Sequence, residues 1–596
     1  MKFRSDIQIL RAIAVLCVLF FHLGIGAFSS GFLGVDVFFV VSGFLMEKLY
    51  AQNKGPMHFY TRRARRLLPA YFVVVLATLA ACWFVTLPPD FSQAGQQVVF
   101  AAGFASNIGF WLQNSYFSKI EFNPLLHLWS LGVEIQYYLF VPFIVWAAAR
   151  WRGALPALIA TSLCLCLLVV HVSPKTSFFM MPLRLWEFGL GMLAARLAPE
   201  DSRRSAVGFA GIAAIILCMM LPVDGESTSI LRGHPALAAL AIALATASVL
   251  YFGIEERLLA NLAGRALRRV GDMSYSVYLV HFPIIVLWFY TPFGGTHLGD
   301  GSWRPALILA PLIALAAALS YFCAERRGGR FLTPARVVAA MAVTAALGLL
   351  LPAAQLRPFP AYQRAIFSAW TDRAPYRCGI AFRLQHPGGQ FCLSRPAGAV
   401  RDTVMLLGDS HADSIRQSFN RAAFAQGSAV AFAVSNEPLI SPGRGPAWMV
   451  AQARALGVRR VFLHYAFHNL TPALVEEARR ANAAAGIETL LILPVPEAGE
   501  HVPQAMYRAS VSGRRLAPLS RSDYEWRLKP LMAYLAEPHA MLTVVDPRPA
   551  LCDAAACAVA QSDGRPYYFD SDHLTLLGAR RLEPVFGSAL ARARGQ

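Results

Sequence analysis

Eleven long apolar runs, all before residue 355, constrain the fold of this chain more than any other feature. A run of about 20 apolar residues, rising 1.5 Å per residue as a helix, can cross a hydrocarbon core of roughly 30 Å. The runs therefore predict a polytopic α-helical membrane domain of ten spans plus one linking span, at 7–25, 32–49, 68–87, 127–149, 154–171, 179–197, 206–222, 235–253, 273–291, 305–324 and 335–353.

The basic residues are distributed among the loops in a pattern that sets the orientation. The N-terminus and every loop after an even-numbered run are rich in Lys and Arg, whereas the other loops are poor in them. The positive-inside rule then predicts a cytoplasmic N-terminus and an extracytoplasmic C-terminal part. It excludes 96–112 as a span, because one more crossing would invert every later loop, so we expect a helix on or in the outer face. The same distribution accounts for the net charge of +19, and we expect no nucleic-acid partner.

The sequence beyond residue 355 has the pattern of a soluble domain. Five apolar runs, separated by amphipathic segments such as 471–486 and 521–536, predict buried parallel strands in a three-layer α/β fold at 403–408, 429–434, 460–466, 488–495 and 541–546. Segment 356–402, rich in Pro, Gly and Arg, is expected to be a linker. Four cysteines at short separations predict two disulfides if this part is in an oxidising compartment, Cys378–Cys392 and Cys552–Cys557.

The first apolar run carries two residues that a simple anchor would not need, Arg11 and His22. A charged side chain within a span costs at least about 2.5 kcal/mol. The two residues are separated by about 16 Å, or three helical turns, and so face broadly the same way. One interpretation is a site for an anionic group at Arg11 with a base or ligand at His22. The other is that Arg11 reaches the cytoplasmic surface and His22 lies in the interfacial zone.

The fourth run begins with three polar residues on one helix face. His127, Ser130 and Glu134 fall at i, i+3 and i+7. A glutamate about two turns into a membrane helix needs a partner or a water-filled cavity. We expect its partner to be a histidine or a residue of the first run; the alternative is a structural hydrogen-bond network between helices.

Other polar residues lie at membrane depth in the second, sixth and ninth runs. The pair Ser42-Gly43 allows close helix approach. The remaining residues are Asp36 just inside the outer face, Arg184 and Glu187, and Tyr278 and His281 in mid-membrane.

Four arginines in five positions, Arg62, Arg63, Arg65 and Arg66, precede the third run at its cytoplasmic end. Topology alone predicts some basic residues here, but such a dense cluster also suits a phosphate-bearing ligand, because guanidinium groups bind phosphate oxygens in pairs. The cluster is therefore either a ligand site or a strong topology signal.

These stretches together resemble acyltransferase family 3, the membrane O-acyltransferases, over residues 1–330. The matching segments are Arg11 and His22 as an R-x10-H pair, GVDVFFVVSGFL, FYTRRARRLLPAYF, HLWSLGVEIQYYLF and SYSVYLVHFP. The resemblance implies transfer of an acyl group, usually acetyl, from cytoplasmic acyl-CoA to a carbohydrate outside. By position, it makes His22 the catalytic histidine with Arg11 as its companion, and Arg63 and Arg66 the residues concerned with acyl-CoA. His22 would act as a general base or as an acyl carrier.

The soluble part contains the residue types of a serine hydrolase. Ser410 follows the first predicted strand in GDSH, and Asp570 and His573 precede a predicted helix in DSDHL. These motifs resemble the SGNH (GDSL) hydrolase family, which implies Ser410 as nucleophile, His573 as base and Asp570 as the orienting carboxylate. Backbone N–H groups at Ser410 would contribute to an oxyanion hole. The family's GxND block is missing, and Asn436 or Asn469 is a candidate to supply the amide.

The sequence thus predicts three regions: an acyltransferase family 3 domain (1–330), a linking helix with a periplasmic linker (331–402) and an SGNH-like domain (403–596). The expected function is transfer of acetyl from acetyl-CoA to an envelope glycan such as lipopolysaccharide O-antigen, by a protein of the bacterial inner membrane. Acyl-CoA, a lipid-linked or envelope glycan acceptor and membrane lipids are the expected partners. Acetyl-CoA is a substrate, and no permanently bound cofactor or metal is expected. Asp36, His127, Ser130, Glu134 and His281 are candidates to contact the substrates.

Two alternatives stay open. The soluble domain could be an esterase that edits acyl groups on the glycan. The chain could instead be a proton-coupled secondary transporter with an external binding domain, in which the intramembrane His and Glu residues relay protons. A transporter predicts inverted repeats and interrupted helices, and we find no clear repeat.

Overall fold

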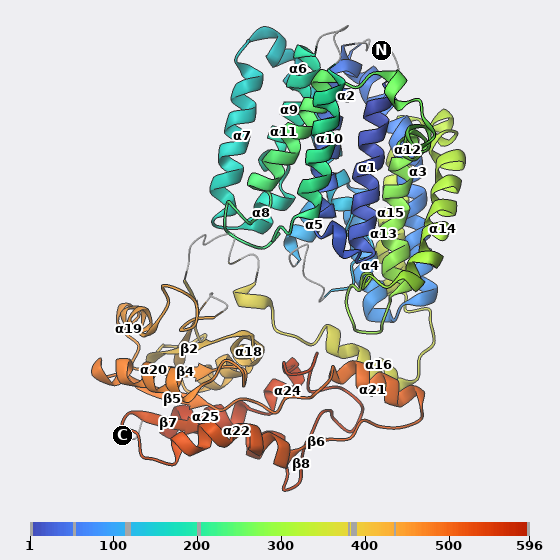
Figure 1. Ribbon diagram of the computed structural model, residues 1–596. Coiled ribbons are helices and arrows are strands. Elements are labelled where there is room, and N and C mark those ends of the chain that lie inside the picture. Colours follow the sequence, from blue (N-terminus) through green and yellow to red (C-terminus); the bar gives the residue numbers. More distant parts are fainter. Residues whose placement is uncertain are drawn as a thin grey trace. The chain divides into compact units, whose positions relative to one another are not determined.

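The computed structural model describes residues 4–51, 55–113, 121–198, 204–379, 382, 390–433 and 437–592. The chain divides into two compact units, Met1–Leu356 and Arg357–Gln596. The first is a bundle of helices and the second an α/β domain (Figure 1). Asn436, a predicted oxyanion-hole candidate, lies outside the described residues.

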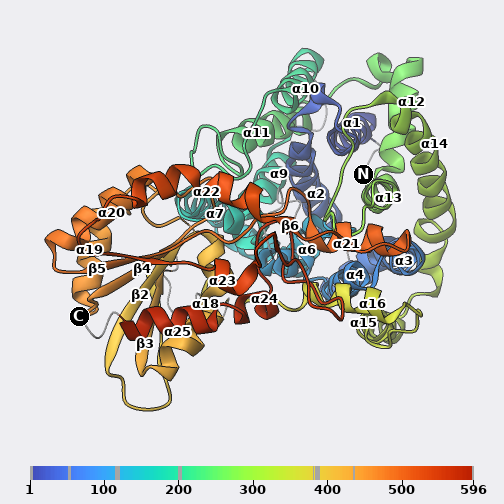
Figure 2. The ribbon, with the colours of Figure 1, turned by 90° about the horizontal axis from the view of Figure 1, so that it is seen from below.

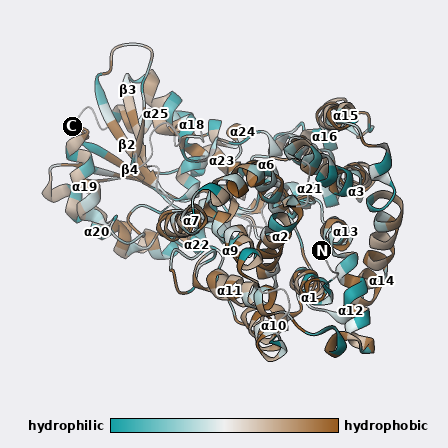
Figure 3. Ribbon diagram, turned by 90° about the horizontal axis from the view of Figure 1, so that it is seen from above, coloured by the Kyte–Doolittle hydropathy of each residue, from teal (hydrophilic) through white to brown (hydrophobic). Residues whose placement is uncertain are grey.

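The first unit consists of helices that follow the apolar runs. They are α1 (Ser5–His22), α2 (Gly34–Tyr50), α3 (Pro56–Val85), α4 (Pro88–Ala102), α5 (Ser106–Leu112), α6 (Leu128–Arg150), α7 (Ala154–Val170), α8 (Pro174–Phe179), α9 (Leu185–Leu197), α10 (Ser205–Met220), α11 (Leu237–Phe252), α12 (Leu262–Asp272), α13 (Ser274–Trp288), α14 (Trp303–Leu319) and α15 (Pro334–Ala353). Hydrophobic residues predominate on α10 and α11 and hydrophilic ones on α12 (Figure 3).

Each of the eleven predicted spans overlaps a helix, which confirms the predicted helical segments. Among the described residues, five helices are long and apolar enough to cross a membrane by themselves, or six if the bent pair α12 and α13 counts as one span. The total of eleven crossings stays a prediction. The stretch 96–112 forms parts of α4 and α5, which are separated by a short break.

Small residues let the helices of this unit approach closely. A Cβ atom added to Gly43 of α2 would lie 1.9 Å from the carbonyl oxygen of Phe188 in α9, and one added to Gly191 of α9 would lie 1.9 Å from that of Val40. A methyl group cannot occupy either position without separating the helices. The predicted close approach at Ser42-Gly43 is therefore confirmed, with α9 as the neighbour.

The second unit is built on a six-stranded sheet in the order β1-β3-β2-β4-β5-β7. The strands are β1 (Phe391–Ser394), β2 (Asp402–Gly408), β3 (Ser428–Ala433), β4 (Arg460–His464), β5 (Glu488–Ile492) and β7 (Leu542–Val545), and a second small sheet pairs β6 (Leu519–Ser520) with β8 (Ala556–Cys557). All five predicted strands are confirmed, and they are parallel to one another.

Helices cover both faces of the sheet, which confirms the three-layer fold (Figure 2). On one face Phe419 of α18 packs against Phe462 of β4 and Phe586 of α25. On the other, α19, α20 and α22 contribute to an apolar cluster with the strands. The helices are α16 (Ala361–Phe367), α18 (Ser410–Ala425), α19 (Pro446–Ala455), α20 (Pro472–Ala484), α21 (Val502–Val511), α22 (Arg521–Leu535), α23 (Arg548–Leu551), α24 (Leu576–Arg580) and α25 (Glu583–Arg592).

The α/β unit contains residues that the sequence analysis placed in the linker. It begins at Arg357 rather than near 403. Strand β1 joins the sheet antiparallel to β3, and Arg377 is 1% exposed with its guanidinium hydrogen-bonded to the carbonyl oxygens of Gly408 and Ala433. Both predicted disulfides, Cys378–Cys392 and Cys552–Cys557, are present, and the first joins Cys378 to β1 within the segment predicted as a linker.

Candidate functional sites

A cavity in the helical unit is lined by polar residues from five helices, α1, α2, α3, α6 and α13. They include Arg11 of α1, Arg63 and Arg66 of α3, Ser130 and Glu134 of α6, and Tyr278 of α13. Arg62 and Arg65, on the other side of α3, are exposed and do not line it. Three guanidinium groups around one cavity favour an anionic ligand with several acceptor oxygens. The arginine cluster is thus divided, with two members at the cavity and two at the surface.

The hydrogen-bond partners of Glu134 differ from those expected. Its carboxylate accepts hydrogen bonds from the hydroxyl groups of Ser42 and Tyr138. Its hydrogen-bond donors are therefore neither a histidine nor a residue of the first run, because α2 places a hydroxyl group there. Arg11 of the first run nevertheless lines the same cavity.

Three buried histidines form a cluster beside this cavity. Nδ1 of His22 lies 3.1 Å from Nε2 of His281, and the rings of His127 and His281 are 5.8 Å apart. Nδ1 of His281 lies 2.7 Å from the carbonyl oxygen of Tyr278, which can only accept, so this nitrogen carries the proton. Neutral His281 therefore accepts at Nε2 from Nδ1–H of His22. This assignment leaves the lone pair of neutral His22 on Nε2.

Tyr278 links the cavity to the histidine cluster. It lines the cavity with Ser130, whose hydroxyl oxygen is 2.7 Å from the Tyr278 hydroxyl. The same Tyr278 hydroxyl donates to the carbonyl oxygen of His127, 3.0 Å away. Arg11 therefore belongs to the cavity and His22 to the adjacent cluster, so the predicted pair lies in two neighbouring sites rather than in one.

Asp36 belongs to a third group, a buried ionic cluster. Its carboxylate lies 3.0 Å from Arg184 and 3.2 Å from His234, and Arg184 lies 3.3 Å from Glu187. All four side chains are at most 2% exposed. Asp36 does not line the arginine cavity. This arrangement joins α2 and α9 to the segment before α11 and gives Asp36 a structural role.

Asp36→Ala should therefore destabilise the fold instead of changing substrate affinity alone. Removing one partner of a buried ion pair typically costs about 3–5 kcal/mol, and here it leaves Arg184 with Glu187 alone. We expect a marked loss of folded protein and a lower melting temperature in detergent. The matched control is Arg196→Ala, which removes the more exposed Arg196–Glu47 pair and should cost about 1 kcal/mol or less. An Asp36 variant with the stability of the parent would contradict the structural role.

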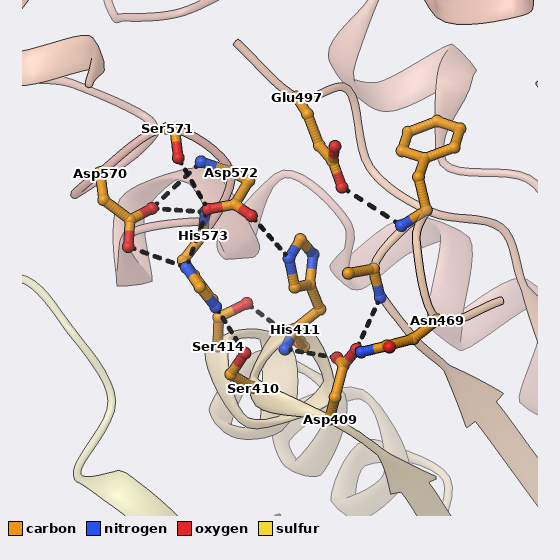
Figure 4. A network of polar contacts seen from close by, with 12 residues as sticks. Asp409, Ser410, His411, Ser414, Asn469, Glu497, Asp570, Ser571, Asp572 and His573 are labelled. Carbon is orange, nitrogen blue, oxygen red and sulfur yellow. Dashed lines mark hydrogen bonds and ion pairs between the residues drawn. The ribbon is translucent and has the colours of Figure 1, made fainter. Parts of the chain in front are cut away.

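The α/β unit assembles the predicted serine site (Figure 4). Ser410 is the first residue of α18, directly after β2, and its Oγ lies 2.7 Å from Nε2 of His573. Nδ1 of His573 lies 2.8 Å from Asp570. Asp570 is itself held by the backbone N–H groups of Asp572 and His573, at 3.1 and 2.8 Å. This is the relay of nucleophile, base and orienting carboxylate that activates a serine hydroxyl.

The turn that presents Ser410 is fixed by Asp409. Its carboxylate caps α18 by accepting from His411 N–H, and it also accepts from Ala466 N–H and the Asn469 amide, each at 2.9 Å. Burial would raise the pKa of Asp409, but the charge of His411 and these hydrogen bonds lower it overall. Asn469, the second oxyanion-hole candidate, thus uses one amide N–H to hold this turn.

Asp572 and His411 also belong to the site, although no role was predicted for them from the sequence. Asp572 lies 3.1 Å from Nδ1 of His573 and 3.3 Å from Nε2 of His411. Burial would lower the pKa of His573, but Asp570 and Asp572 raise it to about 10. Burial would raise the pKa of Asp572, and the two histidines lower it overall. The spacing would also suit a metal ion, but these hydrogen bonds and ion pairs already account for it, so we assign no metal.

The fold and the two sites define a helical membrane protein that carries a serine-hydrolase-like α/β domain. Residues 4–325 match the acyltransferase domain model of acyltransferase family 3, and residues 377–588 match the SGNH domain that occurs fused to it. The chain therefore belongs to acyltransferase family 3, a family of membrane acyltransferases, and carries a fused SGNH domain.

Three curated relatives are similar to this chain over about half of its length. BcsY of Komagataeibacter xylinus, named as a membrane-bound transacylase, is 30% identical over 58% of this chain and 89% of its own length. The O-acetyltransferase OatA of Staphylococcus aureus is 30% identical over 46% of this chain, and YrhL of Bacillus subtilis, named as a peptidoglycan O-acetyltransferase, 27% identical over 53%. The chain spans about half the length of these two, 50% and 53%.

One solved structure also aligns, the periplasmic domain of the lipopolysaccharide acetyltransferase of Salmonella ser. Paratyphi A. The alignment covers 40% of this chain and 98% of the solved chain, with 12% identity and a TM-score of 0.28. The similarity is too weak to support a structural conclusion.

Proposed function

We propose that this protein transfers an acetyl group from cytoplasmic acetyl-CoA to a hydroxyl group of an envelope glycan, such as lipopolysaccharide O-antigen. The observation that carries the proposal is the cavity with Arg11, Arg63 and Arg66 next to the histidine cluster. The relatives named as O-acetyltransferases support acetyl as the acyl group and a glycan as the acceptor. Family membership argues against the transporter alternative.

The proposed topology places the protein in the bacterial inner membrane with ten spans and a linking span. The N-terminus is cytoplasmic, and the domain with Ser410 is periplasmic. The basic loops support this orientation, and the two disulfides suit an oxidising compartment. The three proposed regions remain the acyltransferase domain (1–330), the linking helix with its periplasmic linker (331–402) and the SGNH domain (403–596), with the linker from Arg357 onward packed into the α/β unit.

The arginines would bind the donor and His22 would act on the reacting group. Guanidinium groups of Arg63 and Arg66 match the phosphates of coenzyme A. Nε2 of His22 takes the proton of the attacking hydroxyl group through its lone pair, and the hydroxyl oxygen bonds to the acetyl carbon. The carbon–sulfur bond breaks, and the proton passes to the departing thiolate of coenzyme A. Ser130, Tyr278, His127 and His281 then position this centre through the contacts described above.

The serine site would complete the transfer. The Ser410 hydroxyl attacks an acetyl ester, its proton passes to His573, and a serine ester forms as the donor oxygen leaves with a proton. A glycan hydroxyl then attacks this ester and restores Ser410. Backbone N–H groups at the start of α18 are the proposed donors to the developing oxyanion.

A transfer assay tests the function directly. Membranes that contain the protein receive the lipid-linked glycan of the host and acetyl-CoA that is labelled in its acetyl group. We expect label in alkali-labile esters of the glycan. Label that remains in acetyl-CoA, with folded protein present, would contradict the proposal.

Arg63→Ala and Arg66→Ala should each raise the KM for acetyl-CoA in this assay. Each removes charge-assisted hydrogen bonds to phosphate, worth about 1.5–3 kcal/mol, which corresponds to roughly 10- to 150-fold. Arg62→Ala is the matched control, because Arg62 carries the same charge on the exposed side of α3. Equal effects of the Arg62 and Arg63 variants would show that these arginines serve topology alone.

A further inference from the structure

The serine site contains a second imidazole that serine activation by itself does not require. His411 follows Ser410 in α18 and is 1% exposed. Asp572 bridges the two imidazoles: Oδ2 is 3.3 Å from Nε2 of His411, and Oδ1 is 3.1 Å from Nδ1 of His573. The two rings are 4.6 Å apart (Figure 4).

His573 has one Nδ1 proton but two carboxylates within reach. Asp570 is the nearer, at 2.8 Å, and its other oxygen is fixed by backbone N–H groups. Asp570 therefore suffices to orient the ring. A second carboxylate beside Nδ1 favours the imidazolium form, which cannot accept the Ser410 proton. Asp572 therefore confines the neutral, active base to higher pH, and a group that draws its charge away extends the activity of His573 to lower pH.

His411 is placed to draw the charge of Asp572 away from His573. Its Nε2–H donates to Oδ2 of Asp572, the oxygen that does not face His573. Ser571 donates to the other oxygen from 3.1 Å. Nδ1 of His411 has no hydrogen-bond partner among the described residues. The hydrogen bond to Asp572 is thus the polar contact that the described residues give to the buried His411 ring.

The other charged and titratable groups around the two imidazoles are few. On the His411 side they are Asp409 and Asp413 of its own turn and His464 of β4, whose pKa is lowered to about 4 by burial and by the charge of His411. On the His573 side they are Asp570 and His501, whose pKa is lowered by burial, while Arg373 lies against the Phe569 ring that stacks on His573. Among the described residues, none of these side chains contacts the Asp572 carboxylate; Asp570 accepts a hydrogen bond only from the Asp572 backbone N–H.

We propose that His411 is a positioning residue that, by binding Asp572, weakens the hold of this carboxylate on the imidazolium form of His573. The proposal rests on the serine site proposed above. It predicts opposite effects for the two members of the pair. Loss of the Asp572 charge lets His573 act as a base at lower pH. Loss of His411 lets the full charge of Asp572 act on His573 and confines the base to higher pH.

The test measures the rate at which an alkyl fluorophosphonate labels Ser410 in the full-length protein in detergent, as a function of pH. Ser410 Oγ forms a bond to phosphorus, fluoride leaves, and His573 takes the hydroxyl proton. We expect the acidic limb of the profile to move down by about one to three pH units in Asp572→Asn and up by a similar amount in His411→Phe. His411→Gln, whose amide can donate to Asp572, should restore part of the shift.

The double variant separates this role from a structural one. Because His411 acts through Asp572, His411→Phe should not move the profile further in the D572N background. A uniform loss of labelling at every pH, or a shift that persists in that background, would overturn the proposal. No labelling of the unaltered protein at any pH would instead overturn the serine site, and this inference with it.

Discussion

His22→Ala should abolish acetylation of the envelope glycan, lowering transfer by about 10²–10⁴-fold, the usual contribution of a positioned base. The reason is the hydrogen-bond order in the histidine cluster. His281 donates from Nδ1 to the Tyr278 carbonyl and accepts from His22, so the basic lone pair of His22 is on Nε2. Acetyl esters in the extracted polysaccharide, quantified by NMR, are the measurement.

Two further variants show whether this loss reflects chemistry or folding. His22→Gln keeps an amide that can donate to His281 but has no base, and should be as inactive as the alanine variant. His171→Ala changes an exposed histidine just after α7 and should retain full acetylation. Normal ester content in both His22 variants, at normal protein levels, would refute the acyltransferase mechanism and favour proton relay by a transporter.

The helices and strands could be predicted from the sequence because their cause is local. Runs such as 403–408 and 488–495 are apolar over the length of a strand, and the structure buries them as β2 and β5. Strand β1 escaped prediction because its four residues, Phe391–Ser394, lie in a stretch rich in Pro, Gly and Arg. Its pairing with β3 is a long-range contact without a periodic signal.

The residue types of both sites were also predictable, but their partners were not. The GDSH and DSDHL motifs indicate Ser410 and His573, whose contact spans 163 positions. By contrast, nothing near Asp36 in the sequence indicates His234, 198 positions away. His411 and Asp572, the further pair of the serine site, are the sequence neighbours of Ser410 and His573. Only the fold shows that they contact each other.

Ser410→Ala decides between the two functions that the α/β unit could serve. If the SGNH domain acts in series with the membrane domain, the variant should lose acetyl esters as completely as His22→Ala, because the serine ester can no longer form. The matched control is Ser414→Ala, one turn along α18, whose hydroxyl donates to the His411 carbonyl and not to His573.

An esterase predicts the opposite sign. Its loss would leave the esters made by the membrane domain uncut, so Ser410→Ala would raise the ester content while His22→Ala still abolished it. The double variant then settles the order of the two sites. If the two sites act in series, the ester content of the double variant matches that of either single variant. If the α/β unit is an esterase, it matches that of His22→Ala alone, because esters that are never made cannot be removed.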